Sequence, residues 1–292
     1  MKHAFLILAH KNFNQLSLLI DLLDNPQIDI FLHVDKKSSG FDLPICKYSK
    51  LIQIPSMRTN WGGYSLVECE LRLLEEALIQ DTYDFIHLIS GQDLPIQSVE
   101  EILRFYDLHS NYNFVHYDKP LASIERCKRV KYYYLFQDIK PRRRSLLGLC
   151  QKILVLMQKC IFIDRTKKYE GEFKAGSQWW SIKPDLARYI LSQRELIRRL
   201  FRFTMCDEMF VQTLVYNSDY FHTLYIQETD DLHANQLLVD FSSGASKVWT
   251  MDDIERIRNC DLLFARKFDE CVDSEIINEV VKMVTRNRER ES

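Results

Sequence analysis

Apolar runs of strand length alternate with helical patterns along the first half of the chain. Strands are predicted at residues 5–9, 28–34, 51–55, 85–89 and 114–116. Helical periodicity covers residues 16–23 and 65–78, and the sequence predicts capping boxes for Ser65 with Glu68 and for Ser98 with Glu101. This alternation predicts an α/β fold in which a parallel or mixed sheet is flanked by helices.

The second half of the chain is less regular. Residues 146–163 are mainly apolar, and Gln151, Lys152, Gln158 and Lys159 share one helical face, which predicts an amphipathic helix. Two interpretations remain open. The helix is either packed in the core or placed at a membrane surface, where the basic residues 142–144 would add attraction. A C-terminal helix and tail are expected over residues 276–292.

Composition and charge exclude several classes of protein. The 292 residues are 46% apolar and 27% charged, with a net charge of −2, which is ordinary for a globular chain and predicts no nucleic-acid partner. The eight cysteines show no CxxC spacing, so we expect reduced thiols. The N-terminal apolar run is too short for a signal peptide, so a cytoplasmic location is expected.

Polar side chains follow the predicted strands, where ligands bind in open α/β sheets. His10 follows the first strand, Asp35 and Lys37 follow the second, the segment 58–63 follows the third, and Asp93 lies just beyond the fourth. Any one of them could simply cap a loop. Their concentration on one edge predicts a ligand site.

Three further patterns in the second half carry candidate chemistry. The adjacent cations Arg266 and Lys267 could neutralise a diphosphate, or could be a solvated surface pair. Trp179 and Trp180 follow a glycine and could stack on sugar rings, or one of them could belong to the core. Glu208 follows Asp207 at the predicted start of a helix, so it is either a catalytic carboxylate or a residue that stabilises the helix dipole.

Several motifs are missing from the sequence. The chain contains no Asp-x-Asp triplet, the usual metal-holding motif of metal-dependent sugar transferases, so no metal site is predicted. It also lacks a P-loop, GxGxxG, HExxH and Gly-x-Ser-x-Gly.

Six segments, in order, resemble the family of core-2/I-branching β-1,6-N-acetylglucosaminyltransferases and peptide O-xylosyltransferases. They are HVDKKS at 33–38, WGGYSLV at 61–67, LISGQDLP at 88–95, GSQWW at 176–180, DEMF at 207–210 and FARKFD at 264–269. The resemblance implies a GT-A-like, Rossmann-type mixed sheet in a single glycosyltransferase domain over residues 1–275. Its nucleotide-binding half would be 1–118, and its acceptor and catalytic half 119–275.

The resemblance also implies roles for individual residues. Glu208 is implied to be the general base, and Arg266 and Lys267 are implied to bind the donor diphosphate. The other residues implied on the donor side are His10, Asp35, Lys37, Arg58, Trp61, Gly62, Asp93 and Lys247. Those implied on the acceptor side are Ser177, Trp179, Trp180, Lys128 and Arg129.

The function implied by this resemblance is an inverting, metal-independent transfer of a sugar, GlcNAc or xylose, from a UDP-sugar to a carbohydrate hydroxyl. No cofactor is expected. A bacterial member would act in surface polysaccharide synthesis on a glycan or lipid-linked acceptor, with peripheral contact of 142–163 to the inner face of the plasma membrane. Two alternatives stay open: a metal-dependent nucleotidyltransferase, and a non-catalytic carbohydrate-binding protein at a membrane surface.

Overall fold

The computed structural model describes residues 1–139, 146–242 and 244–291, with side chains described to residue 286. Its centre is a six-stranded sheet in the order β3-β2-β1-β4-β7-β6. The strands are β1 (His3–Ala9), β2 (Ile28–Val34), β3 (Lys50–Gln53), β4 (Phe85–Ser90), β6 (Phe114–Tyr117) and β7 (Gly176–Ile182). β1 to β4 run parallel, whereas β7 is antiparallel to both of its neighbours. The predicted helix-flanked, Rossmann-type mixed sheet is thus confirmed.

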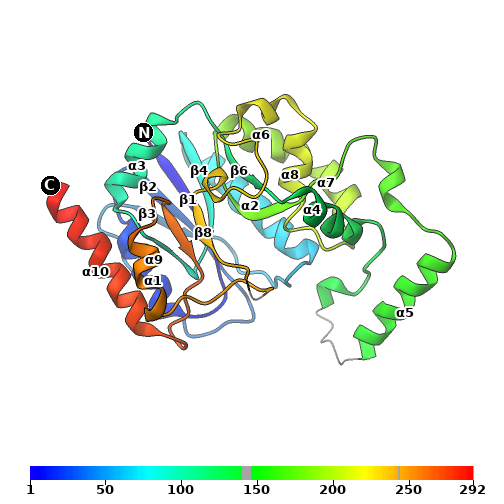
Figure 1. Cartoon of the computed structure of the whole chain (residues 1–292), viewed down its shortest axis with the longest axis horizontal. Coiled ribbons are helices and arrows are strands. Elements are labelled where there is room, and N and C mark those ends of the chain that lie inside the picture. Colours follow the sequence, from blue (N-terminus) through cyan, green and yellow to red (C-terminus); the bar gives the residue numbers. More distant parts are fainter. Residues whose placement is uncertain (140–145, 243, 292) are drawn as a thin grey trace.

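Helices cover both faces of this sheet (Figure 1). α1 (Phe13–Leu23) leads from β1 to β2, and α2 (Tyr64–Gln80) leads from β3 back across to β4, so right-handed crossovers put them on opposite faces. α10 (Ser274–Glu291) packs beside α1, and α6 (Pro184–Ser192) packs beside α2. The four parallel strands consequently end at one edge, where their following loops meet.

A second, three-stranded sheet connects the C-terminal part of the chain to that edge. β5 (Asp93–Pro95) pairs with β9 (Phe264–Arg266), and β9 pairs with β8 (Leu237–Val239). Only Gly91 and Gln92 separate β4 from β5. The cationic segment near residue 266 therefore lies directly beside the loop that follows β4.

The remaining helices surround these two sheets. The α-helices are α3 (Val99–Leu108), α4 (Pro120–Cys127), α5 (Leu146–Cys160), α7 (Arg194–Phe201), α8 (Phe210–Tyr216) and α9 (Ile254–Arg258). The 3-10 turns are η1 (Lys128–Val130), η2 (Gln137–Ile139), η3 (Arg165–Lys168), η4 (Asp219–Thr223), η5 (Leu232–Ala234) and η6 (Met251–Asp253).

One predicted capping box is present and the other is not. The Ser98 hydroxyl accepts a hydrogen bond from the Glu101 N–H, and the Glu101 carboxylate accepts one from the Ser98 N–H, as predicted. The box predicted for Ser65 with Glu68 was wrong. α2 begins after Gly63, and Asp138, from η2, accepts the Ser65 N–H at 3.0 Å in its place.

α5 is amphipathic as predicted, but its apolar side faces outward. Its buried residues are Gly148, Gln151 and Gln158, whereas Leu146 is 83% exposed. The interpretation of this segment as a packed core helix was therefore wrong. Residues 142–144 lie outside the described residues. Within the described part of the chain, no helix combines the length and apolar character needed to cross a bilayer.

Candidate active site

The loops after β2 and β3 are fixed to each other by Asp35. Its buried carboxylate accepts hydrogen bonds from the Thr59 N–H (3.1 Å) and hydroxyl (2.6 Å) and from the Lys37 N–H (2.8 Å). Burial raises the pKa of Asp35, but these hydrogen bonds outweigh burial and the net pKa is lowered. Lys37 Nζ bonds the Thr59 carbonyl and lies 3.3 Å from Asp35. Asp35 and Lys37 thus shape the edge of the site.

The segment Arg58–Gly63 extends from this edge with two exposed side chains. Trp61 is 68% exposed, and Arg58 is exposed and forms no ion pair with any described residue. Gly62 has φ +70°, a conformation that side chains rarely adopt, and its N–H donates to the buried Asp207 carboxylate. The loop that carries Trp61, Gly62 and Gly63 is therefore tied to the segment that carries Glu208.

Arg266 is held from two directions. Its Nη1 lies 2.7 Å from the fully buried Asp93, its partner in the β5–β9 register, and its guanidinium carbon lies 4.5 Å from the centre of the Trp179 ring. Burial raises the pKa of Asp93, and the charge of Arg266 opposes that shift. The structure thus brings together three residues predicted from separate motifs.

Further positive charge gathers around Arg266. Lys267 follows it, and Lys11 pairs with Asp269 at 2.5 Å. Burial lowers the pKa of Lys267, and Arg266 and Lys11 lower it further. Desolvation lowers the pKa of the predicted donor ligand His10, as do Lys11, Arg266 and Lys37, whereas Asp35 acts in the opposite direction. The ends of β1, β2 and β9 are therefore close enough for these charges to interact, and they form one surface that carries Lys11, Lys37, Arg266 and Lys267.

Lys247 lies beside this surface, but its charge is already paired. Its carbonyl accepts the Lys267 N–H at 3.3 Å, so the two backbones are adjacent. Its ammonium lies 2.5 Å from Asp253, whose carboxylate completes the capping box of Thr250 at the start of η6. Lys247 is thus ion-paired within the protein, as Arg266 is, and its predicted donor-binding role stays a prediction.

Glu208 lies across the site, between two arginines. Its Oε2 is 3.1 Å from Arg126 Nη1 and 3.1 Å from Arg129 Nη1. Arg129 was predicted on the acceptor side, whereas Arg126, which also contacts Asp118 and the Gly176 carbonyl, was missed. Arg126 precedes Arg129 by three residues, across the junction of α4 and η1, and residues at this spacing lie on the same helical face. This spacing could have identified Arg126 from the sequence.

The helix predicted to open at residues 204–207, with Asp207 at the capping-box position, begins later. Residues 207–209 form a turn, α8 starts at Phe210, and its N-cap is Met209. Asp207 is buried, and both burial and the charge of Glu208 raise the pKa of Asp207 to about 7, although bonds from backbone N–H groups and the charge of Arg129 oppose this. A second buried acid, Glu70, receives a hydrogen bond from Gln178 at 2.7 Å. Sequence reasoning did not anticipate these two buried carboxyls.

The predicted acceptor residues separate into two groups. Trp179 and Ser177 lie on β7 facing the site, where Trp179 contacts Arg266. Trp180 is only 2% exposed and belongs to the core, because successive strand residues point to opposite faces. Lys128 is exposed and pairs with Glu125. Trp180 is therefore not placed to touch a ligand, whereas the predicted role of Lys128 stays a prediction.

β7 sets the distance between the cationic and the carboxylate sides of the site. The Gly176 N–H donates to the Glu208 carbonyl at 3.0 Å, and Trp179 lies three residues further along the same strand. Three residues of a strand span about 10 Å. Among the described residues, no group of three or more His, Cys, Asp or Glu side chains is arranged to hold a metal ion.

A helix-flanked mixed sheet with cations at the carboxyl ends of its strands, and a carboxylate paired with two arginines near the same edge, is typical of the class of proteins that bind phosphorylated ligands. Within that class the protein can be placed more closely. The family model described as core-2/I-branching enzyme matches residues 3–253, and the chain belongs to this family.

Individual relatives carry xylosyltransferase names. The xylosyltransferase of Ciona intestinalis is 23% identical over 300 residues, covering 94% of this chain and 33% of its own length. Xylosyltransferase 1 of Rattus norvegicus is 22% identical over 302 residues, covering 95% and 35%. The chain thus spans about a third of the length of these relatives. The apo structure of mouse xyloside xylosyltransferase 1 is 8% identical over 91% of this chain and 97% of its own, with a TM-score of 0.39.

Proposed function

We propose that this protein is an inverting glycosyltransferase that moves a sugar, GlcNAc or xylose, from a UDP-sugar to a carbohydrate hydroxyl without a metal ion. Membership of the core-2/I-branching enzyme family supports sugar transfer. A glycan or lipid-linked glycan used in surface polysaccharide synthesis is the proposed acceptor. The arrangement of Glu208 opposite Arg266 and Lys267 supports the mechanism.

Glu208 is proposed to activate the acceptor. Both arginines contact its Oε2, which leaves Oε1 without a hydrogen bond from any described residue and able to accept one from a hydroxyl. In a direct displacement the acceptor oxygen bonds to the anomeric carbon, its proton passes to Glu208, and the bond from that carbon to the phosphate oxygen breaks. One displacement inverts the anomeric configuration.

The departing UDP gains negative charge as that bond breaks. Arg266 is preorganised to meet the charge, since Asp93 and Trp179 hold its guanidinium before any ligand arrives. Lys267 adds an ammonium that pairs with no described carboxylate. Arg266 and Lys267 would then do the work that a divalent ion does in other sugar transferases.

The observation that carries this proposal is that Asp93 and Trp179 together hold the Arg266 guanidinium in place at the end of β9. A UDP-release assay with UDP-GlcNAc, UDP-xylose, UDP-glucose and UDP-galactose, each with EDTA and with Mn²⁺, tests it. We expect release with GlcNAc or xylose donors to persist in EDTA. Release that appears only with Mn²⁺ would refute metal independence. Release of sugar 1-phosphate instead of UDP would indicate transfer of the UMP group, as in a nucleotidyltransferase, and no release from any donor would indicate a binding protein.

A further inference from the structure

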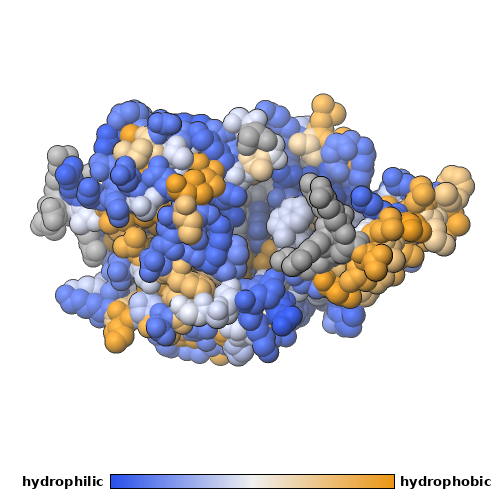
Figure 2. All heavy atoms as spheres, turned by 90° about the horizontal axis from the view of Figure 1, so that it is seen from below, coloured by the Kyte–Doolittle hydropathy of each residue, from blue (hydrophilic) through white to orange (hydrophobic). Residues whose placement is uncertain are grey.

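α5 presents its apolar side to the outside because its polar side is used to attach it. Gln158 accepts the Tyr133 N–H at 2.7 Å and donates to the Tyr133 carbonyl at 2.9 Å. Gln151, one heptad earlier, accepts the Phe136 N–H at 2.9 Å. The exposed apolar side chains of α5 and the turn after it are Leu146, Leu147, Leu149, Ile153, Leu156, Met157, Ile161 and Phe162. Figure 2 shows them as the hydrophobic band at one end of the molecule.

The charges beside this band indicate what covers it. Lys152 and Lys159 are exposed on α5, and residues 146–163 contain no Asp or Glu. A second copy of the helix would bring lysines toward lysines, and 15 residues are shorter than the three to four heptads that a coiled coil needs. An apolar helical face whose own charged residues, Lys152 and Lys159, are both cations fits the surface of an anionic bilayer.

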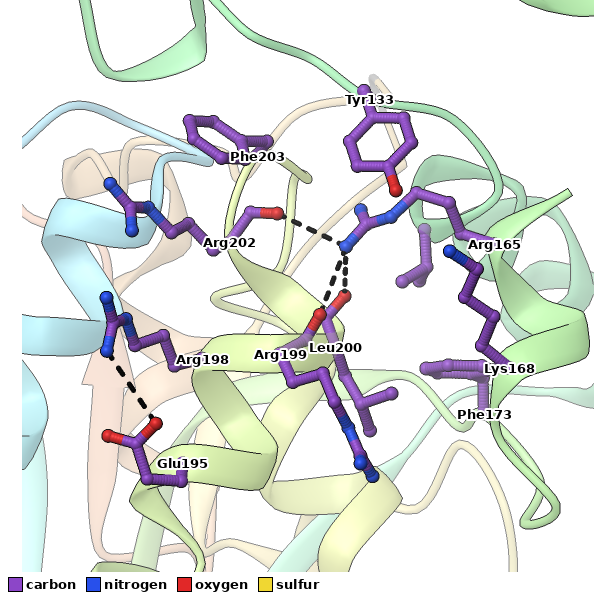
Figure 3. Close-up of a pocket in the computed structure, with 11 residues that line it drawn as sticks. Tyr133, Arg165, Lys168, Phe173, Glu195, Arg198, Arg199, Leu200, Arg202 and Phe203 are labelled. Atoms are coloured by element: carbon purple, nitrogen blue, oxygen red, sulfur yellow. Dashed lines mark hydrogen bonds and ion pairs between the residues drawn. The ribbon is translucent and has the colours of Figure 1, made fainter. Parts of the chain in front are cut away.

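A basic cavity of about 620 Å³ lies next to the attachment of α5 (Figure 3). Arg165, only 9% exposed, reaches over the C-terminal end of α7 and donates from Nη2 to the carbonyls of Arg199, Leu200 and Arg202. Its Nη1 is buried and has no hydrogen-bond partner among the described residues. The Lys168 side chain extends toward Arg165 in Figure 3. Lys168 and Arg199 line the cavity and form no ion pair with any described carboxylate.

Tyr133 joins the cavity to the helix. Its backbone bonds Gln158, whereas its ring lies 4.4 Å from the Arg165 guanidinium carbon and lines the cavity. One short segment therefore holds α5 on one side and the buried arginine on the other. A largely buried guanidinium that lines the cavity, beside the unpaired cations Lys168 and Arg199, is suited to a phosphate group.

We propose that this cavity binds the phosphate of an anionic phospholipid while the apolar face of α5 enters the same bilayer. This phospholipid binding is separate from glycosyl transfer and does not require a sugar donor. Residues 129–133 connect Arg129, which contacts Glu208, to Tyr133, which holds α5, so attachment of α5 to a bilayer would bring Glu208 near a lipid-linked acceptor. This last part of the inference rests on the proposed function.

Vesicle sedimentation in the absence of any sugar donor tests the proposal. The full chain is mixed with vesicles of phosphatidylcholine alone, or of phosphatidylcholine with roughly 30% phosphatidylglycerol, which supplies the negative charge. At roughly physiological salt, the attraction between the basic residues and this charge is only partly screened. We expect sedimentation with the anionic vesicles and at least about tenfold less with the neutral ones, a difference equivalent to about 1.4 kcal/mol. Absence of binding to anionic vesicles would overturn the proposal.

Matched variants separate the two parts of the site. Ile153→Asp with Leu156→Asp should remove vesicle binding, whereas Ile79→Asp with Leu108→Asp, at apolar positions exposed on α2 and α3, should not. Lys168→Glu with Arg199→Glu, which reverses two charges that line the cavity, should also remove vesicle binding. Its control is Arg188→Glu with Lys282→Glu, which makes an equal charge change at exposed positions elsewhere and should leave vesicle binding intact. Circular dichroism confirms that each variant folds. Vesicle binding that survives either test pair would contradict the proposal.

Two other occupants are outcomes of the same experiment. A dimer in analytical ultracentrifugation that the α5 variant abolishes, without vesicle binding, would assign the apolar face to a second copy. Binding of inorganic phosphate that the cavity variant abolishes, without vesicle binding, would assign the cavity to a soluble anion. Either result would overturn the assignment to a lipid.

Discussion

Asp93 and Arg266 lie opposite each other on paired strands and form an ion pair at 2.7 Å, although they are 173 positions apart in the sequence. The carboxylate is fully buried and the guanidinium is partly exposed, so one end of the pair is anchored in the protein and the other reaches the site. Trp179 covers the guanidinium from a third strand. This arrangement fixes a cation where the proposed diphosphate departs.

Arg266→Lys tests whether the planar, clamped guanidinium matters. Lysine keeps the charge but loses the contact geometry with Asp93, Trp179 and a phosphate. We expect kcat/KM for the donor to fall by about 10²–10³, the effect of removing one charge-stabilising donor. Steady-state UDP release measures it. Arg256→Lys, at an exposed ion pair with Asp240, is the control, and an equal loss in both variants would refute the specific role.

Glu208→Gln tests the proposed general base. The amide cannot take the acceptor proton, so we expect transfer to fall by about 10²–10⁴. UDP affinity should change little, because the proposed diphosphate ligands, Arg266 and Lys267, lie at the end of β9 and not in the turn that carries Glu208. Transfer kinetics and calorimetric UDP binding measure the two effects separately. Glu125→Gln removes an exposed carboxylate of α4 and should leave both unchanged; wild-type transfer by the Glu208→Gln variant would contradict the assignment.

Local patterns were predictable from sequence, whereas contacts between distant segments were not. The Ser98–Glu101 capping box depends on residues three apart and is present. The Ser65–Glu68 box is replaced by Asp138, 73 residues away, which no local pattern shows. The orientation of α5 could not be predicted because the partners of Gln151 and Gln158 are backbone groups of another segment. Sequence motifs likewise gave Glu208 but not the arginine Arg126 beside it.

The raised pKa of Asp207 predicts a pH-dependent stability. In the folded protein this carboxyl keeps its proton up to about pH 7, whereas in the unfolded chain it releases it near pH 4. Below about pH 4 the carboxyl is protonated in both states, so ionisation costs the folded state nothing. As the pH rises from about 4 toward 7, only the unfolded chain releases the proton, and the folded protein loses stability relative to it. We expect Asp207 to lower the free energy of unfolding by on the order of 2–4 kcal/mol across that range.

Asp207→Asn should remove that contribution. Denaturant unfolding at about pH 5 and about pH 8 measures the free energy of unfolding of both proteins. We expect the difference between the two pH values to shrink in the Asp207→Asn variant. Asp252→Asn, at an exposed position in η6, should leave the difference unchanged. If the Asp207→Asn variant kept the wild-type difference, Asp207 would be shown to ionise normally.

Gly63→Ala tests how closely η2 packs on the start of α2. A Cβ at this position would lie 2.2 Å from the Asp138 Oδ1 and 3.0 Å from the Asn60 carbonyl oxygen. We expect a loss of about 1–3 kcal/mol in the free energy of unfolding. Combining it with Asp138→Ala removes the nearer atom, so the double variant should lose less than the sum of the single losses. Strict additivity would contradict the predicted overlap.

The central claim is that side chains near the C-terminus, rather than a metal ion, hold the departing diphosphate. Calorimetric binding of UDP and of uridine, both in EDTA, tests it most directly because the two ligands differ only in the diphosphate. We expect UDP to bind at least about a hundredfold more tightly, equivalent to about 2.8 kcal/mol. The Arg266→Ala, Lys267→Ala double variant should lose this difference while keeping its affinity for uridine, and Glu208→Gln should keep both. Equal binding of UDP and uridine by the wild-type protein in EDTA, or a full UDP preference in the double variant, would contradict the account.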